Sequence, residues 1–284
     1  MNWFLFCLKT SRPGLWFPTI WLYTLPIAGQ DIWSEPAFWV GFLYATFPLN
    51  FLVYGWNDMV DQETDRLNPR KDTYLFGARG SDSELNRLPK SILIVQLFSW
   101  PILLFFGSWQ MALVALGIIF FCWIYNAPNW GFRGLPPLEL LSQVGYLLVL
   151  PLSCLLNQVP LPSIDVWFYL FLFCTQSQLI GEVMDIEPDR QAGRDTTATK
   201  LGRVGTKILI IGVVLAETLL VWLHFGDSIF GAGLLGFLLW LLLDVFVLYA
   251  NKAYTMRDFK LLGIGSNVVA LLSMIYVWQV PLFV

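Results

Sequence analysis

Two stretches of the sequence place several carboxylates at the spacing of one helix face. The first stretch is 57–66 and the second is 181–190. Side chains three, four or seven positions apart project from the same face of a helix. We therefore expect two acidic faces, one formed by Asp58, Asp61 and Asp65 and the other by Glu182, Asp185 and Asp189.

The second stretch repeats the first at a distance of 124 residues. Under this shift Asp61 and Asp65 coincide with Asp185 and Asp189, and six of the 17 positions from 57 to 73 are identical. We interpret the match as an internal repeat. Each half of the chain would then contribute one acidic face, and neither half could form the site alone.

The composition is that of a membrane protein. Apolar residues make up 57% of the chain, charged residues make up 13%, and the mean hydropathy is +0.63, which excludes an ordinary soluble domain. Apolar runs long enough to cross about 30 Å of hydrocarbon recur along the whole length. They lie at about 14–30, 37–56, 91–108, 110–127, 138–157, 164–183, 206–224, 228–250 and 261–283. The sequence thus predicts a single all-α domain, residues 1–284: a polytopic bundle of about nine transmembrane helices, arranged as two pseudo-repeats of four plus one.

The basic residues indicate how this bundle is oriented. All 17 Lys and Arg residues fall on alternate connections between the predicted spans, and the other connections have none. By the positive-inside rule, the N-terminus and both acidic stretches are expected on the cytoplasmic side of a plasma or equivalent energy-transducing membrane. A parallel repeat has its axis near the membrane normal, which would bring the two acidic faces together across a central cavity.

Basic residues also accompany the acidic faces. The two longest connections, 66–90 and 190–205, follow them directly, and loops of this size in a compact bundle are commonly functional. Arginine binds phosphate oxygens in bidentate fashion, and lysine binds them as a point charge. The candidates for diphosphate binding are Arg66, Arg70, Lys71, Arg133, Arg190, Arg194 and Lys200.

Carboxylates grouped at the edge of a membrane repel one another unless cations compensate them. Mg²⁺ prefers oxygen ligands and is commonly held by one or two carboxylates together with substrate phosphates. Bound in this way, it would stabilise the charge that develops on a diphosphate as its ester bond breaks. A charged helix end is usually only a solvated surface, but two copies at equal spacing on one side of the membrane favour a functional site.

An apolar cavity beside a diphosphate site suits an isoprenoid diphosphate. Each buried methylene contributes about 0.8 kcal/mol, so such a donor binds through its tail while its head group is held for chemistry. Loss of the diphosphate would leave an allylic cation, which aromatic side chains can shield by cation–π contact. Aromatic residues make up 17% of the chain and supply many candidates.

The motifs Asn57-Asp58-x-x-Asp61-x-x-x-Asp65 and Asp185-x-x-x-Asp189 resemble the paired aspartate-rich motifs of the UbiA superfamily of intramembrane prenyltransferases. The similarity extends over essentially the whole chain. Residues 10–13 (Thr-Ser-Arg-Pro) resemble the start of that family's first helix, and residues 125–133 resemble its Tyr-Ser-x-Pro-Pro-x-Arg segment. Residues 189–197 also match the family pattern.

This resemblance implies an all-helical bundle of nine spans that binds a prenyl diphosphate with Mg²⁺ and transfers the prenyl group to a lipophilic acceptor from the membrane. Such an enzyme is a transferase of alkyl groups other than methyl. Carried over by position, the residues that bind Mg²⁺ and diphosphate would be Asn57, Asp58, Asp61, Asp65, Asp185 and Asp189, with Lys71, Arg133 and Arg194 as phosphate contacts.

Three features depart from the family pattern. Glu182, which we also predict to be a metal ligand, stands where the first motif has Asp58, so its reach to a metal ion differs. Asn129-Trp130 replaces the second proline of the 125–133 segment and alters the local loop. The runs 68–72 and 77–80 look more like the branch that acts on carotenoid or other terpenoid acceptors.

The sequence leaves the acceptor open. An aromatic ring such as a quinone precursor, a carotenoid double bond, a porphyrin side chain, a glycerol ether or a sugar phosphate would each fit the family. A terpene cyclase of the same family is an alternative. A membrane transporter is less favoured, because it would place carboxylates near the midplane and not at the cytoplasmic helix ends. No basic patch beyond the positive-inside bias suggests a nucleic-acid partner.

Overall fold

The chain folds into a bundle of helices. A computed structural model describes residues 2–284, and within that range it contains no strand. The α-helices are α1 (Trp3–Thr10), α2 (Phe17–Thr24), α3 (Pro36–Ala45), α4 (Phe47–Val60), α5 (Gln62–Leu67), α6 (Asp82–Leu85), α7 (Leu88–Phe106), α8 (Met111–Asn126), α9 (Leu138–Leu141), α10 (Val144–Leu147), α11 (Val149–Asn157), α12 (Ile164–Gln191), α13 (Thr197–Leu220), α14 (Ser228–Leu243) and α15 (Met256–Gln279). Shorter 3₁₀ or π turns are η1 (Pro13–Leu15), η2 (Leu25–Ile27), η3 (Phe132–Gly134), η4 (Val221–Phe225) and η5 (Asp244–Leu248). The predicted all-α fold is confirmed.

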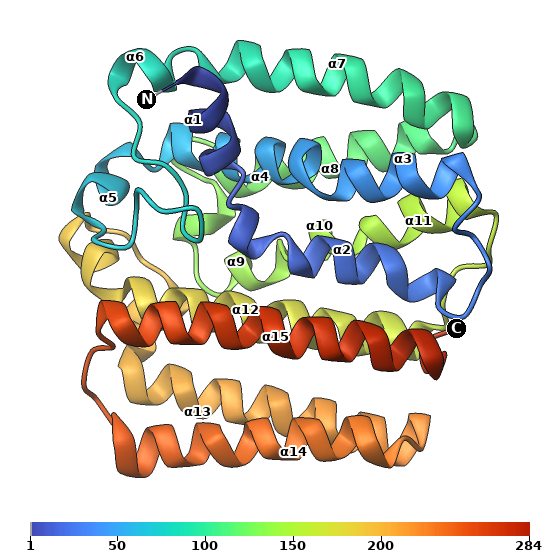
Figure 1. The fold of residues 1–284 in the computed structure, drawn as a ribbon. Helices are drawn as coiled ribbons and strands as arrows, with labels where there is room; N and C mark the ends of the chain where they lie inside the picture. The colour runs from blue at the N-terminus through green and yellow to red at the C-terminus, as the bar shows by residue number, and fades with distance from the viewer. Residues whose placement is uncertain (1) are drawn as a thin grey trace.

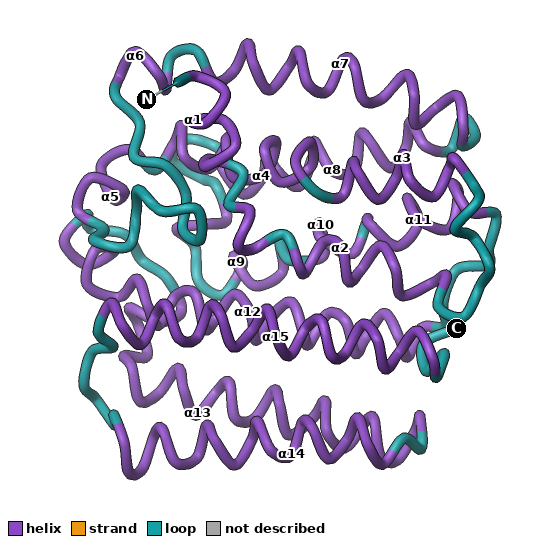
Figure 2. Tube along the Cα trace, in the orientation of Figure 1, coloured by secondary structure: helices purple, strands orange, loops and turns teal. Residues whose placement is uncertain are grey.

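The long helices lie side by side, with α7 along one edge of the bundle and α13 and α14 along the opposite edge (Figure 1). Helices α1, α5 and α6 gather at one end, and the C-terminus lies at the other end (Figure 1). Much of the loop structure collects around α5, at the same end (Figure 2). Helix α5 contacts α12, so the two acidic stretches meet there as the repeat predicts.

Six helical stretches are long and apolar enough to cross a membrane: Pro36–Val60, Asp82–Phe106, Leu138–Asn157, Thr197–Phe225, Ser228–Leu248 and Met256–Gln279. Helix α8 is apolar but shorter, and the predicted span 164–183 forms only part of α12. The predicted span 14–30 is divided into η1, α2 and η2. Pro13, Pro18 and Pro26 fall in these pieces, and proline lacks the N–H that a continuous helix needs. Nine crossings and their orientation therefore stay predictions.

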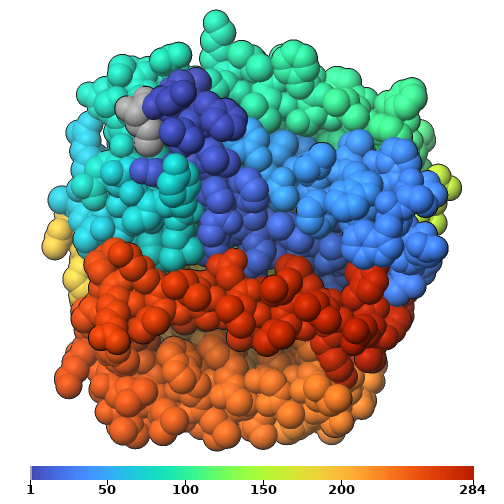
Figure 3. Space-filling view, in the orientation of Figure 1, coloured from blue at the N-terminus to red at the C-terminus, as the bar shows by residue number. Residues whose placement is uncertain are grey.

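Apolar side chains cover the outside of the bundle as well as its core. Phe98 and Phe105 on α7 and Leu223 in η4 are 73%, 81% and 82% exposed, a pattern that suits contact with lipid and not with water. Helix α15 forms a continuous band between the helices of the first half and α14 (Figure 3). These surfaces are those of an integral membrane protein.

Candidate active site

A cavity of about 390 Å³ lies among α2, α4, α8, α12 and α15. Its lining on α12 runs from Phe173 to Asp189, which at 1.5 Å per residue is a length of about 24 Å. Five carboxylates and five basic side chains line the charged end: Asp61, Asp65, Glu182, Asp185, Asp189, Arg12, Arg70, Lys71, Arg133 and Arg194. The other end is apolar and includes Leu22, Leu49, Ile118, Val149 and Phe173.

Asp61 lies at the break between α4 and α5, with φ −92° and ψ 16°. The first acidic stretch is therefore not one continuous helix, in contrast to the expectation from its spacing. Helical hydrogen bonds continue on both sides, from the Asp61 N–H to the Asn57 carbonyl and from the Asp65 N–H to the Asp61 carbonyl. The break is thus confined to Asp61 itself.

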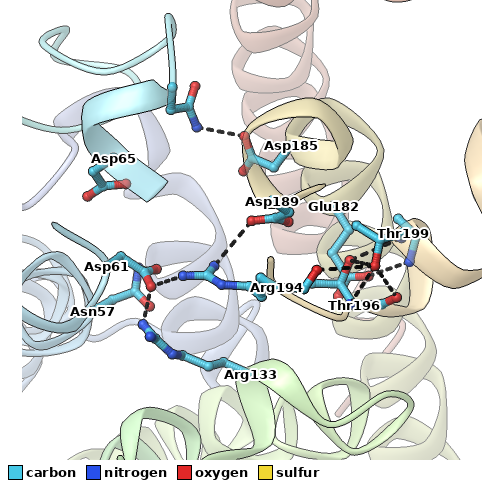
Figure 4. A network of polar contacts seen from close by, with 12 residues as sticks. Asn57, Asp61, Asp65, Arg133, Glu182, Asp185, Asp189, Arg194, Thr196 and Thr199 are labelled. Atoms are coloured by element: carbon cyan, nitrogen blue, oxygen red, sulfur yellow. Dashed lines mark hydrogen bonds and ion pairs between the residues drawn. The ribbon is translucent and has the colours of Figure 1, made fainter. Parts of the chain in front are cut away.

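Two arginines from distant segments meet at this carboxylate. Arg133 in η3 and Arg194 in the loop after α12 both donate to Asp61 Oδ1, and Asn57 Nδ2 donates to Asp61 Oδ2 at 2.9 Å (Figure 4). Asp61 is only 5% exposed. We call Arg133, Arg194 and Asp61 the arginine clamp.

A second ion-pair network lies beside the clamp. Lys71 Nζ is 2.6 Å from Asp58 Oδ1 and 2.7 Å from Asp65 Oδ2, so one ammonium group bridges both carboxylates. Arg12 Nη2 also lies 2.8 Å from Asp58 Oδ1, and its guanidinium stacks over the Tyr54 ring at 4.3 Å. Asp58 thus pairs with two cations through one oxygen, and it is not itself among the residues that line the cavity.

The second acidic stretch joins the first through the loop after α5. Asn68 Nδ2 donates to Asp185 Oδ1 at 2.7 Å, and Arg70 pairs with the same carboxylate. Asp189 Oδ1 lies 3.4 Å from Arg194 Nη1. The two acidic stretches therefore share basic partners and form one site.

The loop between α5 and α6, residues 68–81, lies at the charged end and is held there by contacts with other segments. The Arg70 guanidinium lies over the rings of Phe76 in this loop and Phe259 on α15, at 4.8 and 5.3 Å. Leu75 packs against Gly14 in η1 and Gly263 on α15, where a Cβ at either glycine would overlap its side chain. The loop is thus held between the first and last parts of the chain.

Burial changes the acidity of groups in these loops. It raises the pKa of Asp65 to about 6, and the neighbouring Lys71 opposes this rise. Burial also lowers the pKa of Arg194 to about 10, and it lowers the pKa of Arg133. Arg194 stays charged at neutral pH, while the carboxyl group of Asp65 is protonated at a higher pH than a solvated aspartate.

Glu182 differs from the other predicted metal ligands in what it contacts. Its Oε2 accepts the Ala198 N–H at 3.1 Å, and its Oε1 accepts Gln178 Nε2 at 3.0 Å. Figure 4 shows Glu182 beside Thr196 and Thr199, apart from the carboxylate of Asp61. Both oxygens are thus engaged by the protein, one of them at the N-terminus of α13.

The oxygen donors of the charged end fit Mg²⁺ bound together with a diphosphate. Among residues 2–284, no three Asp, Glu, His or Cys side chains stand close enough to hold an ion alone. Two buried oxygens in the cavity are open to a further ligand: among the described residues Asn57 Oδ1 accepts no hydrogen bond, and Asp189 Oδ1 has only its 3.4 Å ion pair with Arg194. Mg²⁺ usually takes only one or two carboxylates and completes its shell with water and phosphate oxygens. The lining charges balance, so a diphosphate needs accompanying cations to enter.

Three of the predicted phosphate ligands lie outside the cavity. Arg66 pairs with Asp82 at 2.6 Å on the surface, Arg190 donates to the Thr199 carbonyl at 3.5 Å, and Lys200 pairs with Asp195 at 2.6 Å. The remaining predicted basic residues, Arg70, Lys71, Arg133 and Arg194, all line the cavity.

Sequence reasoning missed several lining residues. Arg12 was noted only within the 10–13 motif, although it reaches Asp58, and Asn68 was noted only as part of a loop. Three tyrosines, Tyr54, Tyr125 and Tyr146, also line the cavity. An arginine at the start of an otherwise apolar segment was the available signal for Arg12.

The family model for the UbiA prenyltransferase family matches residues 15–280. A lycopene elongase/hydratase of Corynebacterium glutamicum is 27% identical over 281 residues, which cover 95% of this chain and 96% of that protein. A lycopene elongase/hydratase of Haloarcula japonica is 29% identical over 211 residues, 71% of this chain and 68% of that protein.

Solved structures with a similar fold include a UbiA homolog from Archaeoglobus fulgidus bound to DMAPP and Mg²⁺. It superposes with a TM-score of 0.72 at 16% identity and covers 98% of this chain and 99% of that one. The same homolog bound to GPP and Mg²⁺ gives a TM-score of 0.71 at 15% identity, with 97% of this chain and 99% of that one covered.

Proposed function

Because the chain belongs to the UbiA prenyltransferase family, we propose that it transfers a prenyl group from a prenyl diphosphate to the end of a carotenoid, with Mg²⁺ as cofactor. The observation that carries this proposal is a single cavity with a charged end, formed by both acidic stretches, that continues into an apolar end. The donor class is supported by the fold neighbours with bound DMAPP and GPP. The acceptor class is supported by the lycopene elongase/hydratases, one of which matches almost over its full length.

The residues that would hold the diphosphate and Mg²⁺ are those with oxygen or cationic groups at the charged end. Asp61, Asp65, Asp185 and Asp189 with Asn57 line the cavity and would hold Mg²⁺, directly or through water, and Arg70, Lys71, Arg133 and Arg194 would contact phosphate oxygens. Asp58 is not among the lining residues and would support the site through its ion pairs with Arg12 and Lys71. Bound Mg²⁺ supplies Lewis-acid stabilisation of the departing diphosphate. Since each of these basic groups already pairs with a carboxylate, donor binding would exchange protein ion pairs for contacts with phosphate.

The apolar end would hold the prenyl tail, and the aromatic lining would stabilise the allylic cation. Tyr54, Tyr125, Tyr146 and Phe121 line the same cavity as the charged side chains and Phe173. An aromatic ring face attracts a cation by about 0.5–2 kcal/mol, and more strongly where water is excluded. Arg12 already uses the Tyr54 ring in this way.

The acceptor chemistry follows from the cation. The diphosphate leaves with the electron pair of its C–O bond, and the π electrons of the acceptor's terminal double bond form the new C–C bond. The positive charge then lies on the acceptor's tertiary carbon. Loss of a proton gives an elongated polyene, and capture of water followed by loss of a proton from the added oxygen gives an alcohol. Both outcomes agree with the name lycopene elongase/hydratase that the relatives carry.

The cavity size limits how the acceptor enters. About 390 Å³ is at the lower end of the range of roughly 300–1,000 Å³ for ligand pockets. A cavity of this volume suits a donor and one end of a long polyene, whereas a whole carotenoid is too large for it. The rest of the acceptor would stay in the lipid.

We also propose that the charged end faces the cytoplasm, as the distribution of Lys and Arg indicates.

The test is a reconstituted reaction. The purified protein in lipid nanodiscs is incubated with Mg²⁺, lycopene and one of dimethylallyl, geranyl, farnesyl or geranylgeranyl diphosphate, and products are identified by mass spectrometry. We expect a carotenoid heavier by one prenyl unit, with or without added water, and no product without Mg²⁺ or in an Asp61→Asn/Asp185→Asn double variant. A cyclic hydrocarbon formed without acceptor would instead establish a terpene cyclase. Turnover only with an aromatic acceptor would refute the carotenoid assignment.

A further inference from the structure

We propose that Glu139 is a positioning residue that sets the separation of the two arginines in the clamp, assisted by Glu182. The proposal rests on the function proposed above. Neither glutamate is required to touch the metal ion or the diphosphate. Their role is to fasten the N-terminus of α13 to two other elements, so that Arg133 and Arg194 reach Asp61 together.

The first turn of α13 has its free N–H groups satisfied by side chains from three different segments. The Thr197 N–H donates to Glu139 Oε1 at 2.7 Å, and the Thr197 hydroxyl donates to the same oxygen at 2.5 Å. The Ala198 N–H donates to Glu182 Oε2 at 3.1 Å, and the Thr199 N–H donates to Thr196 Oγ1 at 3.2 Å. These N–H groups have no partner within the helix, and the helix dipole favours negative charge there.

The position of Glu139 in the chain determines which two segments the Glu139–Thr197 contact joins. Glu139 lies in α9, which directly follows the η3 segment that carries Arg133. Thr197 begins α13, three residues after Arg194. The Glu139–Thr197 contact therefore ties together the two segments whose arginines donate to Asp61.

The loop that carries Arg194 is held at its other end as well. The Arg194 N–H donates to the Asp189 carbonyl at 2.8 Å, and Thr199 Oγ1 lies 3.4 Å from the Arg194 carbonyl. Gly193, with φ +68°, makes the turn out of α12. With α12 fixed at one end and Glu139 and Glu182 fixing the other, the guanidinium of Arg194 has little freedom to move away from Asp61.

Glu139 is buried to 1% exposure, so its contact is made away from water and lipid. Its Oε2 has no hydrogen-bond partner among the described residues. An amide nitrogen in place of Oε2 would therefore break no existing bond, while the amide oxygen could still accept from Thr197. Glu139→Gln is thus a conservative variant, and Glu139→Ala removes the tie.

The experiment measures donor KM and kcat for Glu139→Ala and Glu139→Gln, together with thermal unfolding in nanodiscs. We expect Glu139→Ala to raise the donor KM about 10-fold or more, and Glu139→Gln to restore KM to within about threefold of the unaltered chain. The matched control is Asp227→Ala, which removes the carboxylate that caps α14 by accepting the Phe230 N–H at 2.6 Å, at the far end of the bundle. It should lower thermal stability without changing the donor KM.

A double variant tests whether Glu139 acts through the clamp. In an Arg194→Ala background, Glu139→Ala should add little further loss in donor affinity, because the group that it positions is absent. The inference is wrong if Glu139→Ala changes donor KM and thermal stability in the same way as Asp227→Ala. It is also wrong if Glu139→Ala raises donor KM as much in the Arg194→Ala background as it does in the unaltered chain. If Glu139→Ala does not fold, Thr197→Val removes only the hydroxyl contact and should show a smaller loss of the same kind. Failure of the unaltered chain to bind donor with Mg²⁺ would instead refute the proposed function.

Discussion

Replacement of Asp61 by Asn tests the central arrangement most directly. Asp61 accepts from Arg133, Arg194 and Asn57, and it is almost completely buried. An amide oxygen can still accept one or two of these bonds, but the negative charge that the two guanidinium groups share is lost. The substitution changes no side-chain volume appreciably, so its effect reports charge.

Two opposite effects should follow in the Asp61→Asn variant. Loss of one oxygen ligand from a metal shell should weaken apparent Mg²⁺ affinity by about 10- to 100-fold, and loss of one preorganised electrostatic contact should lower kcat by about 100- to 1,000-fold. At the same time the two arginines lose the carboxylate that they share, although Arg194 keeps its ion pair with Asp189. Both guanidinium groups are partly exposed, so the free energy of unfolding should fall by less than the roughly 3–5 kcal/mol that is typical when a fully buried charge is left unpaired. Inorganic pyrophosphate without Mg²⁺ should therefore bind the variant more tightly than the unaltered chain and should restore its thermal stability.

The assay is Mg²⁺-dependent release of pyrophosphate from geranyl diphosphate, with pyrophosphate binding followed by calorimetry. Asp82→Asn is the control, because Asp82 also pairs with an arginine, Arg66, but on the surface, where such pairs contribute little. A variant at Asp61 with kcat within about threefold of the unaltered chain, and an unchanged Mg²⁺ requirement, would refute the reasoning.

Four further outcomes are expected. Chelation of divalent ions by EDTA should abolish prenyl transfer, and added Mg²⁺ should restore it; activity that survives dialysis against EDTA would contradict the metal assignment. Because the pKa of Asp65 is raised to about 6, its proton competes with cations below that pH, so apparent Mg²⁺ affinity measured by titration should be constant above pH 7 and fall about tenfold per unit well below pH 6. Phe173→Ala should shift the preferred donor to a longer chain, measured as kcat/KM across the four donors, because Phe173 is the lining residue of α12 farthest along the helix from Asp189 and its ring packs at a tilt against Trp21, with 4.9 Å between the ring centroids; an unchanged preference would show that Phe173 does not limit the length of the donor tail. Arg66→Ala and Lys200→Ala should leave donor KM within about twofold, since both side chains pair on the surface, and a large rise would show that the loops rearrange on binding.

The sequence predicted those features that depend on local pattern. Apolar runs indicate helices whatever their partners are, and the repeat of Asp61 and Asp65 as Asp185 and Asp189 indicated that two helix ends meet. The contact between Asn68 and Asp185 bears this out. The breaks in the first predicted span were not predicted, because hydropathy measures the preference for an apolar environment and does not register that proline interrupts a helix.

The residues assigned by proximity in sequence were the least well predicted. Arg66 follows Asp65 directly, but each step along a helix rotates the side chain by about 100°, so Arg66 points to the surface while Asp65 lines the cavity. Glu182 aligns with Asp58, yet the two carboxylates have different neighbours: Asp58 faces Arg12 and Lys71, whereas Glu182 faces the start of α13. Such differences arise from contacts between segments far apart in the chain, which a one-dimensional pattern does not contain.

The loop after α5 is fastened to α15, and this has a consequence for biogenesis. Leu75 needs the open backbone at Gly263, and Arg70 needs the ring of Phe259, but α15 is synthesised after every other helix. A nascent chain that has inserted α1 to α14 already carries both acidic stretches, but the loop beside them is held only by the first part of the chain and by α12, through Gly14, Lys9 and Asp185. The loop that carries Arg70 would therefore gain its last supporting contacts only when translation reaches α15.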